Sequence, residues 1–266
     1  MSECTTGGYA SVRLPAAESY HAPMQVARWI ATALFYLAVP LFLVLSNVRV
    51  ATMEPRVYDY SFDRYGVDVV TRMDRTQLSA AARDLVRYFQ DDRPALATRV
   101  VVDGQEQPLF NQRETVHMQD VKTLFGWVFL AHQIALAYVL AYVTAVFLWA
   151  RERSLRTLAG QLIRGGVVTV GVLGVAAAAS LVGFDAIFYM FHVISFANDF
   201  WLLNPATDRL IQMFPRDFWF MVTLAVGFAT MMEGALLVLA GYGLRAWLDR
   251  AARIDAAPAA ADAFRA

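Results

Sequence analysis

Two histidines stand in segments whose composition suits acid–base chemistry beside a membrane. His117 lies in NQRETVHMQDVK, and His192 lies in DAIFYMFHVISFANDFW. An imidazole has an unperturbed pKa of about 6.5, so it accepts or donates a proton at neutral pH. Both residues fall just outside long apolar stretches of the chain. They are therefore the first candidates for a reactive pair.

The residues around His117 repeat at helical spacing. Arg113, His117 and Asp120 are related as i, i+4 and i+7, and Glu114 precedes His117 by three residues. In a helix these side chains share one face. A carboxylate on that face would orient the imidazole.

The segment around His192 is rich in aromatic residues, as is typical of a membrane–water interface. If it is helical, Ser195 lies one turn after His192, and Asn198 and Asp199 lie about two turns after it. Trp201 is then an interfacial anchor or lines a groove for an acyl chain. The alternative is that both histidines are interfacial aromatic residues, hydrogen-bonded to backbone or loop, without a catalytic role.

The elements that must position these residues are membrane-spanning. The chain has 266 residues, 58% of them hydrophobic, and 23 basic residues balance 23 acidic ones. This balance gives no reason to expect nucleic acid, and the single cysteine, Cys4, excludes an internal disulfide. Stretches of roughly 20 apolar residues cross a bilayer as helices. We predict an α-helical membrane protein with four transmembrane helices at residues 29–46, 123–150, 165–183 and 218–244.

The distribution of arginine predicts the orientation of these helices, because basic residues near span ends stay in the cytoplasm. A cytoplasmic tail (1–28), loop (151–164) and second tail (245–266) then alternate with an extracytoplasmic domain (47–122) and an extracytoplasmic interfacial loop (184–217). Both histidines fall on the extracytoplasmic side. The arginines that decide this are Arg151, Arg153, Arg156, Arg164, Arg245, Arg250, Arg253 and Arg265.

Residues 47–122 carry their own start and turn signals, so we expect a small α+β domain between helices 1 and 2. Asp74 and Gln77 form a capping-box pattern before an apolar repeat of helical period. Asp103-Gly104 is a favoured two-residue hairpin turn. Asn111 with Glu114 repeats the capping box and starts a helix that continues into the second span.

Polar residues and glycines inside the spans have structural interpretations. His132 and Glu233 are costly at this depth. Their positions along the spans differ by roughly 9 Å, which disfavours a direct pair. We expect Glu233 to be hydrogen-bonded and to hold helices together rather than to serve transport. Gly166, Gly171 and Gly174 predict close helix packing.

Two segments resemble a known family, the lipoprotein intramolecular transacylases. They are FNQRETVHMQDVK (residues 110–122) and FHVISFANDFWLLNPATDRLIQMFP (residues 191–215), in a chain with four predicted spans and one external domain. The motif histidines of the family fall on His117 and His192.

The resemblance implies an enzyme of the bacterial cell membrane. It would move an acyl chain from the sn-2 oxygen of a lipoprotein's diacylglyceryl-cysteine to the α-amino group of the same cysteine, giving a lyso-form lipoprotein. His117 and His192 would be catalytic, and no metal or other cofactor is implied. As substrate-binding or supporting residues we place beside them Arg113, Glu114, Asp120, Ser195, Asn198, Asp199 and Trp201.

Three alternatives remain open. One is an interfacial hydrolase or acyltransferase with Ser195 as nucleophile and His192 as base, although the chain has no G-x-S-x-G elbow there. Another is metal binding by the two histidines with Asp120 or Asp199, although no H-E-x-x-H motif is present. The third is a structural or transport protein without chemistry.

Overall fold

The structure is a computed structural model that describes the backbone of residues 21–150 and 154–263 and the side chains of residues 25–148 and 155–254. Cys4, Arg151, Arg153 and Arg265 lie outside these residues, as does most of the expected N-terminal tail. The chain divides into two compact units, Met1–Leu34 and Phe35–Ala266. The described part of the first unit, residues 21–34, is helical, and all elements after α1 belong to the second unit.

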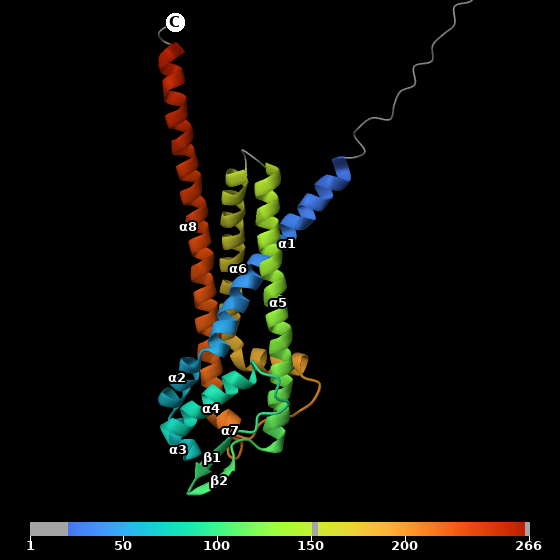
Figure 1. Cartoon of the computed structure of the whole chain (residues 1–266), viewed down its shortest axis with the longest axis vertical. Coiled ribbons are helices and arrows are strands. Elements are labelled where there is room, and N and C mark those ends of the chain that lie inside the picture. The colour runs from blue at the N-terminus through green and yellow to red at the C-terminus, as the bar shows by residue number, and fades with distance from the viewer. Residues whose placement is uncertain (1–20, 151–153, 264–266) are drawn as a thin grey trace, which may run out of the picture. The chain divides into compact units, whose positions relative to one another are not determined.

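Ten elements follow one another along the described chain (Figure 1). They are α1 (His21–Met53), α2 (Pro55–Tyr65), α3 (Val67–Thr71), α4 (Arg75–Tyr88), β1 (Arg99–Val102), β2 (Gln105–Pro108), α5 (Gln112–Ala150), α6 (Ser154–Ser195), α7 (Arg209–Met213) and α8 (Arg216–Ala263).

Four helices among the described residues are long and apolar enough to cross a membrane, which confirms the predicted fold class. The qualifying stretches are Gln25–Met53, Gln112–Leu148, Leu155–Ser195 and Arg216–Ile254. Their outward side chains are apolar and exposed, as Val175, Val182 and Leu236 illustrate. Exposed apolar surface on this scale, on helices of this length, is typical of a membrane-spanning protein.

The short elements lie together at one end of the long helices and share one core (Figure 1). The Asp74 carboxylate accepts the Gln77 backbone N–H at 2.9 Å, so the predicted cap of α4 is confirmed. Asp103 and Gly104 have φ of 52° and 77°, the left-handed values that a two-residue turn between β1 and β2 requires. The predicted small α+β segment between the first two spans is therefore present.

The core of this α+β segment is completed by residues from much later in the chain. Met213 and Phe214, at the end of α7, and Phe218, in the first turn of α8, are buried in the same cluster as Phe62 and Leu78. The Ser61 hydroxyl also donates a hydrogen bond to the Met213 carbonyl at 3.0 Å. The segment 47–122 thus depends on α7 and α8 for a closed core.

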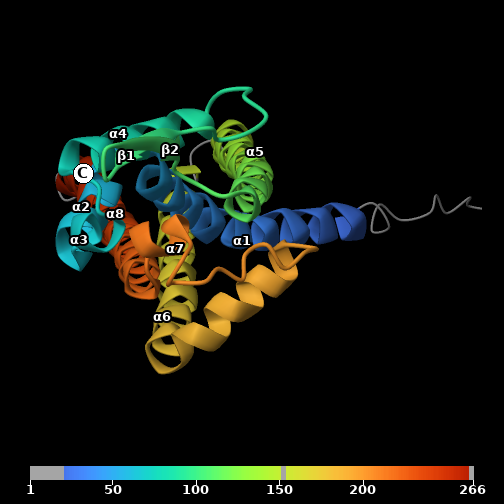
Figure 2. The same ribbon diagram turned by 90° about the horizontal axis from the view of Figure 1, so that it is seen from below.

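Residues 184–195 differ from the expected interfacial loop, because they are the last part of α6. The backbone leaves helical geometry at Gly183 (φ −146°, ψ 43°), and the helix then continues in another direction (Figure 2). Residues 184–195 contain neither proline nor glycine, so no helix-breaking residue ends the helix before residue 195. The bend brings His192 toward α5.

Two consecutive residues of α1 form hydrogen bonds with other spans. Ser46 Oγ and His132 Nε2 lie 2.9 Å apart, which ties α1 to α5. The Asn47 amide donates to Glu233 Oε2 at 2.9 Å and to Thr230 Oγ1 at 3.2 Å, which ties α1 to α8. The expected hydrogen bond of Glu233 to another helix is present, and His132 and Glu233 each pair with α1.

Close packing of α6 on α8 depends on glycine. A Cβ at Gly166 would collide with the carbonyl oxygen of Gly234, and one at Gly241 would lie 2.8 Å from the carbonyl oxygen of Ala159. The prediction of a packing glycine therefore holds for Gly166. It is wrong for Gly171, where an added Cβ would meet no atom of another described segment within 4 Å.

We predict that Gly166→Ala lowers the thermal stability of the detergent-solubilised protein. Forcing a methyl group against the α8 backbone costs about 1–3 kcal/mol. The matched control is Gly171→Ala, which adds the same methyl group in open space and gains helix propensity. Equal melting temperatures for the two variants would contradict the packing role of Gly166.

Candidate active site

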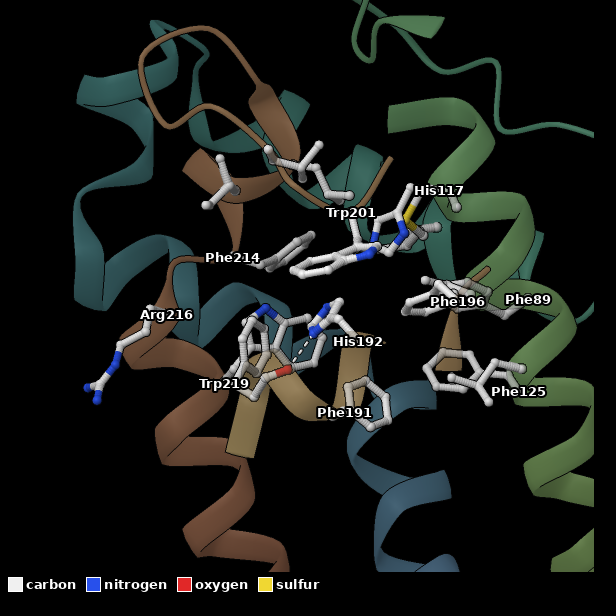
Figure 3. Close-up of a pocket in the computed structure, with 18 of the residues that line it drawn as sticks. Phe89, His117, Phe125, Phe191, His192, Phe196, Trp201, Phe214, Arg216 and Trp219 are labelled. Carbon is white, nitrogen blue, oxygen red and sulfur yellow. Dashed lines mark hydrogen bonds between the residues drawn. The ribbon is translucent and has the colours of Figure 1, made fainter. Parts of the chain in front are cut away.

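The two candidate histidines meet although they come from different long helices. His117 belongs to the first turns of α5, and His192 belongs to the last turn of α6. Their ring centroids are 6.1 Å apart, with the ring planes inclined at 34° (Figure 3). Both side chains are buried, with 7% and 8% of their surface exposed. A group held between them would reach both imidazoles.

Both rings line a cavity of about 190 Å³ whose walls are nearly all apolar. Aromatic surface comes from the C-cap residues of α4 and α7, from α5 and α6, and from the start of α8: Phe89, Phe214, Phe125, Phe191 and Trp219 (Figure 3). A cavity of this composition suits an alkyl chain with a few polar atoms at one end.

His192 has a defined orientation and a defined neutral tautomer. Its Nδ1 lies 2.7 Å from the carbonyl oxygen of Phe188, one turn earlier in α6. A carbonyl oxygen only accepts hydrogen bonds, so Nδ1 carries the hydrogen and Nε2 carries the lone pair. The ring is also packed against Phe188 and Trp201, at centroid distances of 4.4 and 5.0 Å. Nε2 is therefore the proton-accepting atom.

His117 keeps a polar atom available. Its Nδ1 is buried and has no hydrogen-bond partner among the described residues. The ring is held by an edge contact with Phe196, at a centroid distance of 5.0 Å. Buried polar atoms are rarely left unpaired, so this nitrogen is suited to bind a group that enters the cavity.

Arg113 and Asp120 share the helix face of His117 as predicted, but they bind the loop after α6 rather than the imidazole. The Asp120 carboxylate accepts the Asn198 amide at 2.9 Å. Arg113 donates to the main-chain oxygen of Asp199. Asn198 and Asp199 therefore fasten the loop to α5. The prediction that a carboxylate orients the His117 ring is wrong, because the ring is held by packing against other rings.

Glu114 is fully buried and joins two separate segments. Its Oε2 accepts the Asn111 backbone N–H at 2.8 Å, and the Asn111 side chain accepts the Glu114 N–H at 3.0 Å, which confirms the predicted capping box. Its Oε1 accepts the backbone N–H of Leu210, in the first turn of α7, at 2.6 Å. Glu114 thus fixes α7 against the start of α5.

The remaining predicted residues divide between the cavity and its surroundings. Trp201 lines the cavity, whereas Ser195 is half-buried outside it. Asp199 is exposed and contributes its main-chain oxygen. Among side chains 25–148 and 155–254, no three His, Cys, Asp or Glu residues are grouped as metal ligands.

Several residues of the site were missed from the sequence, among them Phe188, which packs against the His192 ring, and Tyr58, which lines the cavity. Phe188 could have been found, because a residue four positions before His192 shares its helix face. Tyr58 of α2 also lines the cavity, and no sequence signal connects it with the histidines. Its hydroxyl donates to the Thr52 carbonyl at 2.7 Å, and burial raises the pKa of the Tyr58 phenol, so it stays protonated.

Residues 33–219 match the family described as lipoprotein intramolecular transacylase Lit. The chain belongs to the Lit family. The matched region includes both histidines and both segments in which the resemblance lay, so the predicted family is confirmed.

Solved structures of a Lit protein have the same fold. The lipoprotein intramolecular transacylase Lit from Bacillus cereus matches with a TM-score of 0.67 and 16% identity, over 85% of this chain and 97% of that one. A variant of it with one histidine replaced by arginine matches with a TM-score of 0.69 and 13% identity, over 89% of this chain and 100% of that one.

A curated relative is an uncharacterized protein of Aquifex aeolicus (strain VF5). It is 28% identical over 134 residues, which are 50% of this chain and 56% of that protein. This Lit-family chain therefore matches little more than half the length of that relative.

We predict that Glu114→Gln destabilises the protein. The amide replaces one of two accepting oxygens by an NH₂ group that faces a backbone N–H, and a buried donor left unpaired costs about 1–3 kcal/mol. Thermal unfolding in detergent measures the effect. Glu106→Gln makes the same chemical change on exposed β2 and should leave the melting temperature nearly unchanged.

Proposed function

We propose that this Lit-family protein catalyses intramolecular acyl transfer on a bacterial lipoprotein. The acyl chain leaves the sn-2 oxygen of the diacylglyceryl-cysteine and joins the α-amino group of the same cysteine. The product is a lyso-form lipoprotein. The observation that carries this proposal is the meeting of His117 and His192 in one apolar cavity.

The two imidazoles have complementary proposed roles. His192 Nε2 accepts a proton from the attacking amine, because its Nδ1 is already committed to the Phe188 carbonyl. His117 donates a hydrogen bond to the oxygen on which negative charge develops, through a nitrogen without a partner among side chains 25–148 and 155–254 and the described backbone. A preorganised donor of this kind contributes about 2.7–4 kcal/mol.

The reaction balances without a covalent enzyme intermediate. The amine nitrogen attacks the ester carbonyl carbon, an N–C bond forms, and the bond from that carbon to the sn-2 oxygen breaks. The proton taken up by His192 passes to the departing glycerol oxygen. Nucleophile and ester belong to one molecule, so holding them in contact supplies several kcal/mol of the barrier reduction. The position of Ser195 outside the cavity fits this scheme.

The proposed topology places the site at the extracytoplasmic face of the cell membrane. Arg156 of α6 and Asp249 of α8 form an ion pair at 2.8 Å, so the arginine-bearing ends of these helices lie side by side. Their basic character favours a cytoplasmic position for these ends and for both termini. The α+β segment and the cavity then face outward, where a lipid-anchored substrate has its modified cysteine.

We predict that the purified wild-type protein converts a diacylglyceryl-lipopeptide with a free α-amino group into its N-acyl lyso form. Mass spectrometry of the product, with fragmentation to locate the acyl chain, is the measurement. His117→Ala and His192→Ala should each reduce the rate on the order of 10²–10⁴-fold, because each removes a positioned proton-transfer group.

Ser195→Ala separates this mechanism from the serine alternative. It should retain the wild-type rate, since no acyl-enzyme is formed. Direct transfer would be overturned if Ser195→Ala lost activity and if an acyl group were trapped on Ser195 of the wild-type protein. An unchanged lipopeptide with folded wild-type protein would overturn the proposed function itself.

A chelator distinguishes the metal alternative. We predict that dialysis against excess EDTA leaves the initial rate unchanged, because the proposed proton transfers use imidazoles and substrate alone. Loss of rate that returns on adding Zn²⁺ would instead assign the histidine pair to a metal.

A further inference from the structure

The loop of residues 196–203, here called the strap, follows α6 in the chain and contacts α5, the helix that carries His117. Its Asn198 amide donates to the Asp120 carboxylate at 2.9 Å. Its Asp199 carbonyl accepts from Arg113, whose guanidinium also lies over the Phe200 ring at 5.8 Å from the centroid. The strap is therefore fixed to α5 at two points.

These two attachment points lie on either side of His117. Arg113 precedes it by four residues and Asp120 follows it by three, on the same helix face. Residues of the strap also contact both reactive rings. Phe196 is 5.0 Å from His117 and 5.6 Å from His192, and Trp201 is 5.0 Å from His192, between ring centroids.

The strap is ordered by its own hydrogen bonds. Asn198 Oδ1 accepts the Phe200 backbone N–H at 3.0 Å, while its amide donates to Asp120. The Asp199 carbonyl accepts the Leu202 N–H at 3.1 Å. Asn198 and Asp120 thus satisfy each other and are not aimed at a ligand. This arrangement suits the positioning of other groups better than the binding of substrate.

We propose that the strap is a positioning device that sets the separation and orientation of the two imidazoles, with Asp120, Asn198 and Arg113 as positioning residues. The inference rests on the proposed function, because a fixed separation matters only to groups that react together. Movement of a reacting group by about 1 Å costs on the order of a hundredfold in rate.

The Asp120–Asn198 pair allows a charge-swap experiment. Asn198→Asp sets two carboxylates against each other and should lower kcat on the order of a hundredfold, with KM for the lipopeptide nearly unchanged. Asp120→Asn keeps an accepting oxygen and should cost less. The double variant Asp120→Asn/Asn198→Asp restores an amide-to-carboxylate bond with its direction reversed, and should recover most of the lost kcat.

The matched control is Thr123→Ala. Thr123 is exposed on the same helix, and its hydroxyl donates only to the Gln119 carbonyl of its own helix at 3.0 Å. This variant should have wild-type kcat. A loss in Asn198→Asp that the double variant does not recover would overturn the proposal, as would a loss confined to KM, which would assign the strap to substrate binding.

A second measurement tests the positioning role of the strap independently of acyl-transfer activity. Diethyl pyrocarbonate modifies accessible imidazoles, and peptide mass spectrometry gives separate rates for His117, His192 and the intramembrane His132. Asn198→Asp should raise the rates at His117 and His192 several-fold and leave His132 unchanged, and the double variant should restore protection. Wild-type labelling rates in Asn198→Asp would overturn the inference.

The two measurements separate failure of the strap from failure of the function. Suppose that the labelling rates at His117 and His192 rise in Asn198→Asp and return in the double variant, but that the wild-type protein has no transacylase activity. The positioning role of the strap would then be supported and the proposed reaction rejected. If Asn198→Asp does not fold, Arg113→Gln is the second variant. It removes the contact between Arg113 and the Asp199 carbonyl and leaves the Asn198–Asp120 hydrogen bond in place. It should show the same rise in labelling and the same loss of kcat.

Discussion

Two imidazoles must be held about 6 Å apart, between ring centroids, inside a cavity with almost no polar wall, and the surrounding structure follows from this constraint. Few protein hydrogen bonds are available there. His192 donates one to the Phe188 carbonyl of its own helix, and His117 Nδ1 has no partner among the residues that the structure describes. Orientation therefore comes mainly from ring packing by Phe188, Phe196 and Trp201, and the polar contacts that control it lie outside the cavity.

Those outer contacts connect segments that are distant along the chain. Glu114 joins the start of α5 to α7, and α7 leads directly into α8. The aromatic core then includes residues of α2, α4, α7 and α8. The outer α+β segment is for this reason not a separable domain, because its core and the floor of the cavity use the same side chains, such as Phe214.

The helix bundle supplies a rigid base for this arrangement. Gly166 lets α6 approach α8 closely, and Asn47 joins α1 to α8 through Glu233. Hydrogen bonds between spans are worth only about 0.6–2 kcal/mol each, so the bundle relies on packing and uses its polar pairs to define register. The bend after Gly183 then carries the end of α6 from the bundle toward α5.

The sequence by itself determined the four spans, the caps of α4 and α5 and the hairpin turn, and it singled out the two histidines as candidates. Each of these depends on residue type, on apolar length or on neighbours within a few positions, so it can be read locally. The tertiary structure alone decided that Asp120 binds Asn198, that Glu114 binds the Leu210 N–H, and that Tyr58 reaches the cavity. A polar side chain takes the partner that folding brings within about 3 Å, and that partner is set by helix packing and by the bend in α6 rather than by spacing along the chain.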